Sequence, residues 1–143
     1  MTSHLLVFLL SATTASTVLA QAPTLQVSLT GIQHDRGGMR VGLYSDPKTF
    51  RKEAQAVAIQ QVPAQPGTTT VSFRALRPGR YAIMAYHDED GNGEMNRRFG
   101  MFPTEGYGLS NNPAVSGPPA FEDSAFEVVA GEPPTSISID IRY

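Results

Sequence analysis

The chain alternates apolar and polar residues through most of its length after residue 24, and this period of two restricts it to β-structure. The alternation is visible over residues 25–29, 39–43, 57–59, 71–75 and 137–141. Such a pattern is typical of strands with one buried face and one solvated face. We therefore expect Val57 and Ile59 to lie on an inward face, and likewise Ile137, Ile139 and Ile141.

Residues 81–87 differ, because they are apolar at nearly every position. A strand of this kind is central in its sheet, and we expect the facing sheet to cover one side and a loop the other. Pro and Gly break the chain between the strands, and only residues 48–56 have the pattern of a helical turn, with Phe50 as its inward anchor. The sequence predicts an all-β fold, a single antiparallel β-sandwich of about seven strands over residues 24–143.

The first 20 residues have the composition of a cleaved signal peptide. They contain no Asp, Glu, Lys or Arg, and an apolar run at 5–10 leads to small residues ending at Ala20, with Ala22 as the alternative cleavage position. A membrane anchor needs roughly 20 continuous apolar residues, and here the run breaks at Ser11. We expect a periplasmic or secreted domain with no membrane span after cleavage. The chain has no cysteine, so no disulfide stabilises it.

A net charge of −2 with scattered Lys and Arg argues against a nucleic-acid partner, which requires a basic face. The acidic residues gather instead just after the central strand. Asp88, Asp90 and Asn92 stand at alternate positions before Gly93 and Glu94, as in the first half of a calcium-binding loop, where position 7 ligates through its carbonyl. Position 12 of that loop would be Phe99, which supplies no carboxylate. This is therefore not an EF-hand.

The remaining ligands of such a calcium site would come from elsewhere, and the candidates are Glu94, Glu105, Glu122 and Asp123. The alternative is a solvated turn, because Asp, Asn and Gly favour turns with or without a metal. Ca²⁺ is thus the one cofactor that the sequence suggests. Two histidines beyond the signal segment, with no cysteine, argue against a dedicated zinc site.

Residues 88–121 form a long segment with little periodicity, and segments of this length in compact domains are usually functional or disordered. We expect it to fold back onto the sandwich, because it carries many apolar side chains. It also holds the ligand-binding candidates: Glu105, Tyr107, Phe99 and Phe102. Aromatic rings beside carboxylates suit a glycan or a peptide of the cell envelope or the extracellular medium. The alternative is that the rings only pin the segment to the sheet.

Four blocks of the chain resemble one family of exported bacterial proteins, domain of unknown function 2141. In order, the blocks read LRPGRYAI from Leu76, HDEDGNG from His87, EGYGLSNN from Glu105 and FEDSAF from Phe121. More distantly, the first block followed by the acidic loop is similar to transthyretin-like and collagen-adhesin-B-like sandwiches, which serve as stalks and accessory modules. The resemblance implies an exported β-sandwich, and it implies no activity, because the family has none established.

No nucleophile–base motif is present, and His87 and Asp88, as neighbours on a strand, point to opposite faces. We therefore expect no enzyme, but a module that binds an envelope or extracellular component through residues 88–121. A purely structural or accessory domain is the alternative. A more remote alternative is a hydrolase using carboxylates drawn from this segment and from Glu122.

Overall fold

The computed structural model describes Ser16, residues 21–131 and residues 133–143. Apart from Ser16, the predicted signal peptide at residues 1–20 lies outside the described residues. None of the helices in the described part of the chain combines the length and the apolar character needed to cross a membrane.

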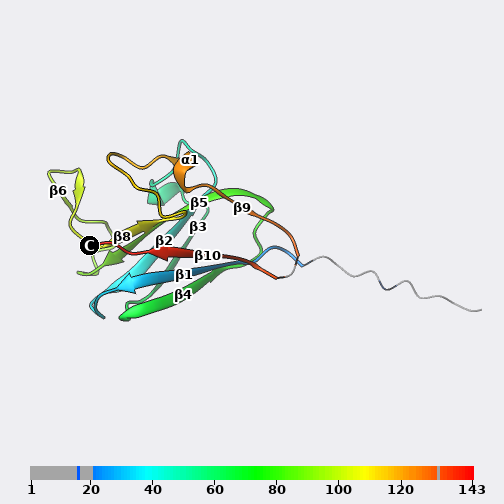
Figure 1. The fold of residues 1–143 in the computed structure, drawn as a ribbon, viewed down its shortest axis with the longest axis horizontal. Helices are drawn as coiled ribbons and strands as arrows, with labels where there is room; N and C mark the ends of the chain where they lie inside the picture. The colour runs from blue at the N-terminus through cyan, green and yellow to red at the C-terminus, as the bar shows by residue number, and fades with distance from the viewer. Residues whose placement is uncertain (1–15, 17–20, 132) are drawn as a thin grey trace, which may run out of the picture.

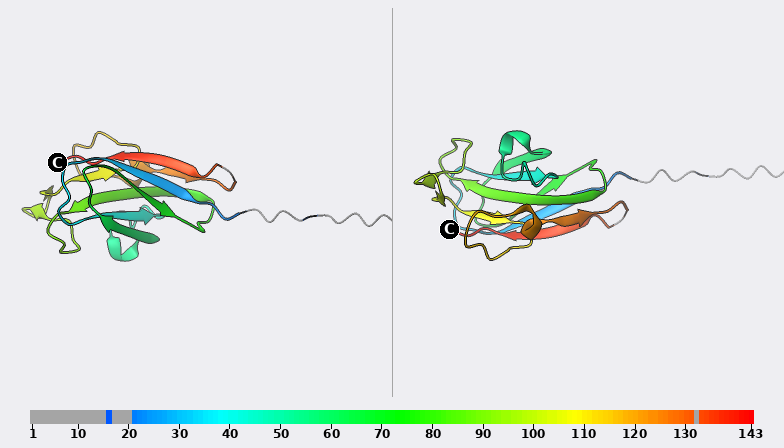
Figure 2. Two further views of the ribbon diagram at one scale, coloured as in Figure 1. Left: turned by 90° about the horizontal axis from the view of Figure 1, so that it is seen from below. Right: turned by 90° about the horizontal axis from the view of Figure 1, so that it is seen from above.

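The fold is a β-sandwich of two sheets, seen edge-on as two layers in Figure 2. The first sheet has the order β10–β1–β4, with bounds Thr135–Asp140, Leu25–Ile32 and Gly67–Phe73. The second has the order β3–β2–β5–β8, with β9 also paired to β5, and its bounds are Ala58–Pro63, Gly38–Tyr44, Gly79–Asp88, Tyr107–Leu109 and Phe126–Val128. A small hairpin projects from one end, formed by β6 (Arg97–Arg98) and β7 (Phe102–Pro103) (Figure 1). The predicted fold class is confirmed.

The main core lies between the two sheets and is built from the alternating positions of the strands. Leu25, Val27 and Leu29 of β1 are fully buried, as are Val41 and Leu43 of β2. In and after β10, Ile139 and Ile141 are buried, and Ile137 is partly buried against the same cluster. The inward orientation predicted for these isoleucines is confirmed.

β5 is buried on both faces, as its sequence predicts. Ile83 and Ala85 face the main core, whereas Ala82 and Met84 belong to a second apolar cluster on the outer side of the sheet. That second cluster is completed by side chains from loops and neighbouring strands: Tyr44, Phe50, Leu109 and Phe121. Phe50 thus anchors the segment that carries the 3-10 helix η1 (Glu53–Gln55), and Phe121 begins the short helix α1 (Phe121–Ser124).

Two expectations about the strands are wrong. β1 and β10 pair in parallel, with Leu29 opposite Ile139, so the sandwich is not purely antiparallel. In addition, Val57 and Ile59 are exposed, and the side of β3 that packs on the core carries Ala58 and Val62. Alternation cannot identify the inward face when apolar residues occupy both faces of an edge strand.

The long segment is divided into two parts with different roles. Its second part returns to the sandwich, because β8 pairs with β5 and both Leu109 and Phe121 are buried. Its first part ends in the β6–β7 hairpin, where Phe99, Met101 and Phe102 are the exposed apolar side chains. The expectation that this segment folds back is therefore confirmed for β8 and α1, and it is wrong for the hairpin tip.

Candidate functional site

The acidic turn begins with Asp88, the last residue of β5, and is organised by carboxylate–amide hydrogen bonds. The Oδ1 atom of Asp88 accepts from the backbone N–H of Asn92 at 3.1 Å, and its Oδ2 accepts from the N–H of Gly93 at 2.9 Å. The Oδ1 of Asn92 in turn accepts from the N–H of Glu94 at 2.9 Å. Asp88 and Asn92 therefore curl the backbone in the way their spacing predicts.

Glu105 closes this turn from the far side of the β6–β7 hairpin. Its carboxylate accepts from the backbone N–H groups of Glu89 and Asn96, both at 3.0 Å. The Asn96 side chain donates to Asp90 Oδ2 at 2.7 Å, which adds a further link across the turn. Glu105, which follows the hairpin, is thus bonded to two backbone groups that precede it.

Three carboxylates converge here, since one oxygen each of Asp88, Asp90 and Glu105 lies within 4.8 Å of the others. Asp88 and Glu105 are only 2% and 5% exposed, and among the described residues neither forms an ion pair. Hydrogen bonds from Asn96 and from the backbone hold the pKa of Asp90 below its usual value. Gathered, desolvated carboxylates of this kind suit a hard cation with oxygen ligands, such as Ca²⁺.

Of the four additional ligand candidates, the structure brings Glu105 to the turn. The Glu94 side chain is exposed and is not among the three carboxylates that converge. The predicted ligand at this position is the backbone carbonyl. Glu122 and Asp123 lie on α1, where Glu122 forms an ion pair with Arg80 instead.

Beside the acidic turn, the outer face of the second sheet is hollowed by an open depression of about 210 Å³. Its lining comes from β2, β5, the η1 segment and the acidic turn, and consists of Arg40, Gly42, Tyr44, Arg51, Glu53, Met84, Tyr86, Glu94, Met95 and Arg97. Gly42 leaves room for a neighbouring aromatic ring, because a Cβ atom there would lie 2.9 Å from the Tyr44 hydroxyl. The lining mixes aromatic and apolar side chains with five charged ones.

The polar groups of this depression are only partly paired with each other. Arg40 forms an ion pair with Glu53, and the Tyr86 hydroxyl lies 3.1 Å from Glu53 Oε2. Burial, reinforced by Glu53, raises the pKa of Tyr44 to about 12 and that of Tyr86 above its usual range, so both hydroxyls stay protonated. Arg51 has a positive φ of 68°, and its buried Nε atom has no hydrogen-bond partner among the described residues.

The predicted ligand-binding residues do not converge on this depression. Glu105 is buried in the acidic turn, and Phe99 and Phe102 are exposed at the hairpin tip. Tyr107 is half-buried on β8, where its backbone also bonds to that of Arg142. None of the four lines the depression. Of its lining residues, Glu94 was a site candidate, whereas Arg51 and Tyr44 were missed, because their proximity depends on the η1 segment folding over β2.

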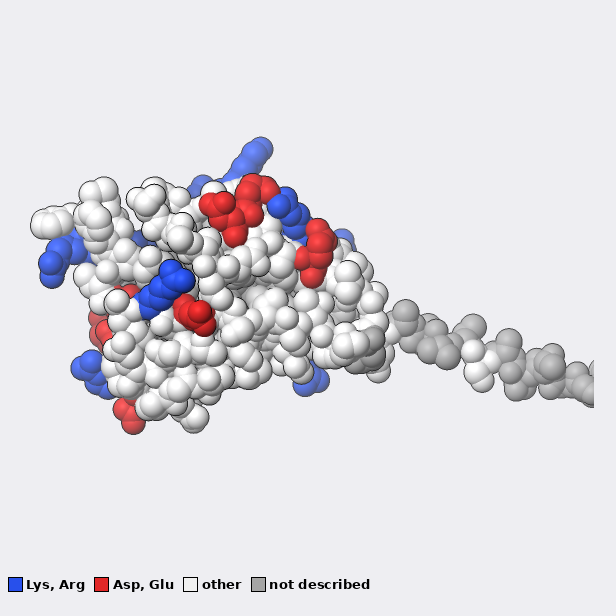
Figure 3. All heavy atoms as spheres, in the orientation of Figure 1, with Lys and Arg blue, Asp and Glu red and all other residues white. Residues whose placement is uncertain are grey.

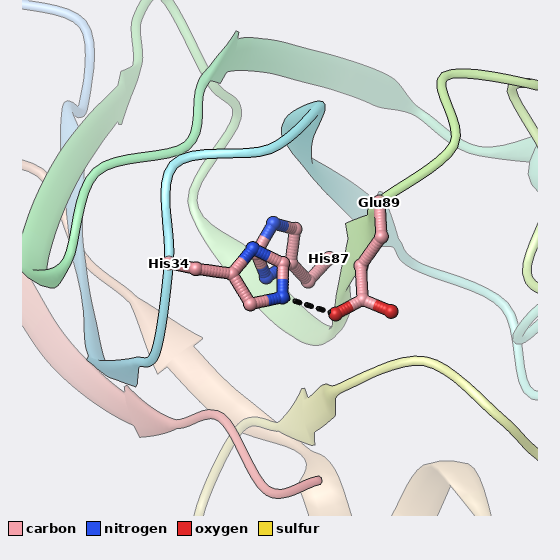
Figure 4. A group of neighbouring side chains, drawn as sticks. All are labelled: His34, His87 and Glu89. Carbon is pink, nitrogen blue, oxygen red and sulfur yellow. Dashed lines mark hydrogen bonds and ion pairs between the residues drawn. The ribbon is translucent and has the colours of Figure 1, made fainter.

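A second cluster, also missed from the sequence, lies on the other side of Asp88. The rings of His34 and His87 stack with centroids 4.4 Å apart, and Glu89 contacts the Nε2 atom of His34 (Figure 4). The approach depends on Gly37, where a Cβ atom would lie 1.9 Å from the Asp88 carbonyl oxygen. His34 precedes β2, and β2 pairs with β5 so that Met39 lies opposite His87. Only that register brings the two histidines together.

Comparison with protein families gives one match, to bacterial proteins described as uncharacterized and conserved, DUF2141, over residues 27–137. The match covers most of the chain. The chain belongs to the DUF2141 family. No curated protein and no solved structure matches it.

The part of the chain matched to DUF2141 contains the acidic turn, the depression and both His34 and His87. Tyr143, whose hydroxyl lies 2.6 Å from His87 Nδ1, is beyond the matched residues. The family description names no activity, so the chemistry of the site has to be argued from its residues. Charged side chains of both signs are scattered over the face shown in Figure 3, without one large patch of a single sign.

Proposed function

We propose that this DUF2141 protein is a non-catalytic exported module that binds an envelope or extracellular component in the depression beside the acidic turn. The observation that carries the proposal is the lining, which brings together sheet residues and residues 94–97 of the long segment. Tyr44 and Tyr86 offer ring surface, and the protonated Tyr44 hydroxyl offers a donor, whereas the Tyr86 hydroxyl already donates to Glu53 and Gly93. Small-ligand sites usually combine aromatic and apolar surface with directed polar groups, and the charged side chains of this lining suit a polar ligand.

Arg51 favours a ligand with an anionic group. Its Nε is a buried donor without a partner among the described residues, and leaving such a donor unpaired costs free energy. Arg97 lines the same depression and takes part in none of the ion pairs found in the described part of the chain. A carboxylate or phosphate on a glycan or peptide would pair with both guanidinium groups.

Calcium is part of the same proposal as a stabilising ion rather than a catalytic one. Asp88, Asp90 and Glu105 would supply carboxylate oxygens, and Asn92 and the Glu94 carbonyl would complete the set. The charge of the ion would compensate the two buried carboxylates. Because residues 94–97 line the depression, ordering the turn would also order the ligand site.

The test is a binding screen with matched pairs of neutral and acidic oligosaccharides and of peptides with free and amidated carboxyl ends. The Arg51→Asn variant removes the guanidinium and suits the positive φ at this position. Arg74→Asn, at an exposed arginine after β4, is the matched control. We expect acidic ligands to bind and Arg51→Asn alone to weaken them by about tenfold or more. A screen without hits would favour the structural alternative, and equal binding by Arg51→Asn would show that the ligand does not use this arginine.

A further inference from the structure

We infer that His34, His87 and Glu89 form a binding site for a divalent transition-metal ion, separate from the proposed calcium site. One ligand atom of each residue lies within 4.8 Å of those of the other two. The three side chains come from the β1–β2 connection, from the end of β5 and from the residue after β5, and they point toward one another in Figure 4. A metal ion here would connect a loop to the central strand.

The hydrogen bonds of His87 place the ring hydrogen on Nε2 and leave the lone pair of Nδ1 to bind a metal. Its Nε2 lies 2.6 Å from the carbonyl oxygen of Arg36, and because a carbonyl only accepts, Nε2 carries the hydrogen. In the neutral ring Nδ1 therefore has the lone pair, which accepts from the Tyr143 hydroxyl at 2.6 Å. Metal-ligating histidines typically donate their other N–H to a backbone carbonyl or a carboxylate in this way. Tyr143 is half-exposed and can release Nδ1.

His34 and Glu89 supply the other two ligands on the solvent side of His87. The Nε2 of His34 and the Oε1 of Glu89 are in direct contact, and both side chains keep about a quarter of their surface exposed. An ion would lie between these two atoms, with the proton of the neutral His34 ring on Nδ1. Nδ1 would then give up the hydrogen bond of 3.3 Å that it accepts from the backbone N–H of Arg36. The partial exposure leaves an entry path, whereas His87 is fully buried and forms the floor of the site.

Two imidazoles and one carboxylate form a donor set for Zn²⁺, Cu²⁺ or Ni²⁺, whereas calcium and magnesium prefer oxygen ligands. The acidic turn next to it offers oxygen alone. Glu89 joins the two sites, because its N–H donates to Glu105 while its side chain contacts His34. Two histidines without a cysteine are too few ligands for zinc, and the fold adds the carboxylate of Glu89 as a third.

The Arg36 side chain opposes a cation here, since its Nη2 lies 3.4 Å from His34 Nε2. Arg36 is exposed, so its guanidinium can turn into solvent when a metal ion enters. Removing this charge in Arg36→Gln should therefore tighten metal binding. Weaker binding by Arg36→Gln would contradict the electrostatic part of the inference.

The test is zinc titration of the mature chain without a histidine tag, by calorimetry and by competition with a chromophoric chelator. We expect one ion per chain and weaker binding at acid pH, because ligating imidazoles must be unprotonated. His34→Asn and Glu89→Gln should each lower the affinity by about tenfold or more. Glu127→Gln, at an exposed position on β9 opposite Arg80, should leave zinc affinity unchanged.

His34 and Glu89 are partly exposed, so these variants are expected to fold, and melting without metal checks this. Long-range ¹H–¹⁵N spectra of the imidazoles provide a second readout, in which zinc should shift His87 Nδ1. No binding at millimolar zinc, or an unchanged affinity in folded His34→Asn, would overturn the site. Since these residues do not line the depression, failure here leaves the proposed ligand site intact.

Discussion

The Glu105 carboxylate accepts a hydrogen bond of 3.0 Å from the backbone N–H of Glu89, which fastens the return of the long segment to the end of β5. The two residues are separated by the whole β6–β7 hairpin. Each oxygen of this buried carboxylate thus has one backbone donor, and each keeps a further lone pair. This contact makes the projecting hairpin an ordered part of the domain.

Replacing Glu105 with Gln should lower the free energy of unfolding by about 1–3 kcal/mol, because an amide N–H₂ would face a backbone N–H in a buried place. Urea unfolding measures the difference. Glu94→Gln is the matched control, since that side chain is exposed, and its stability should stay within about 0.5 kcal/mol of the parent. Equal stabilities for the two variants would show that Glu105 does not hold the segment.

Millimolar Ca²⁺ should raise the melting temperature, because an ion that binds the folded state alone stabilises it by mass action. Asp90→Asn removes one converging carboxylate at an exposed position and should reduce the shift. The double variant Asp88→Ala, Asp90→Ala should abolish it. Glu122→Gln, which disrupts only the pair with Arg80, is the control and should keep the full shift. If Ca²⁺ does not raise the melting temperature, or raises it equally in Asp90→Asn, the acidic turn does not bind calcium and is held by its hydrogen bonds alone.

Asp90 should titrate below its ordinary pKa of 3.8, because Asn96 and the backbone donate to its charged form. A carboxyl whose folded pKa is lowered stabilises the fold above its unfolded pKa, and this stabilisation is lost as the pH falls through the folded value. Removing the Asn96 side chain in Asn96→Ala should therefore raise the pKa of Asp90 toward 3.8. NMR titration of the Asp90 carboxyl carbon measures this, and an unchanged value would contradict the assigned cause.

The sequence indicates those parts of the fold that depend on local pattern. The alternation of Leu25, Val27 and Leu29 identified a strand and its buried face, and the apolar run of β5 identified the central strand. The parallel pairing of β1 with β10 was missed, because alternation is the same in either direction. In the same way, their spacing in the sequence places Asp90 near Asp88. Glu105 is only one of four distant candidates in the sequence, and the folded chain alone shows that it joins these two carboxylates.

Ile139→Asp should prevent folding, because it places an unpaired charge at a position with no exposed surface. The neighbouring Ser138→Asp is the matched control, since Ser138 is exposed on the opposite face of β10. Circular dichroism and amide spectra of the two variants compare them directly. An Ile139→Asp protein that melts like the parent would contradict the assignment of β10 to the core.

Phe99→Asn should stabilise the protein, which is unusual for the removal of an aromatic ring. Phe99 and Gly100 have φ values of 55° and 68°, and the N–H of Met101 bonds to the Arg98 carbonyl at 3.2 Å, as in a type I′ turn. Asn tolerates this conformation, whereas a bulky residue is strained by about 1 kcal/mol. The ring is 83% exposed, so its loss removes little packing. Phe99→Ala keeps the strain and should show no gain in urea unfolding. Lower stability of Phe99→Asn than of the parent would mean that the ring packs against the domain in solution.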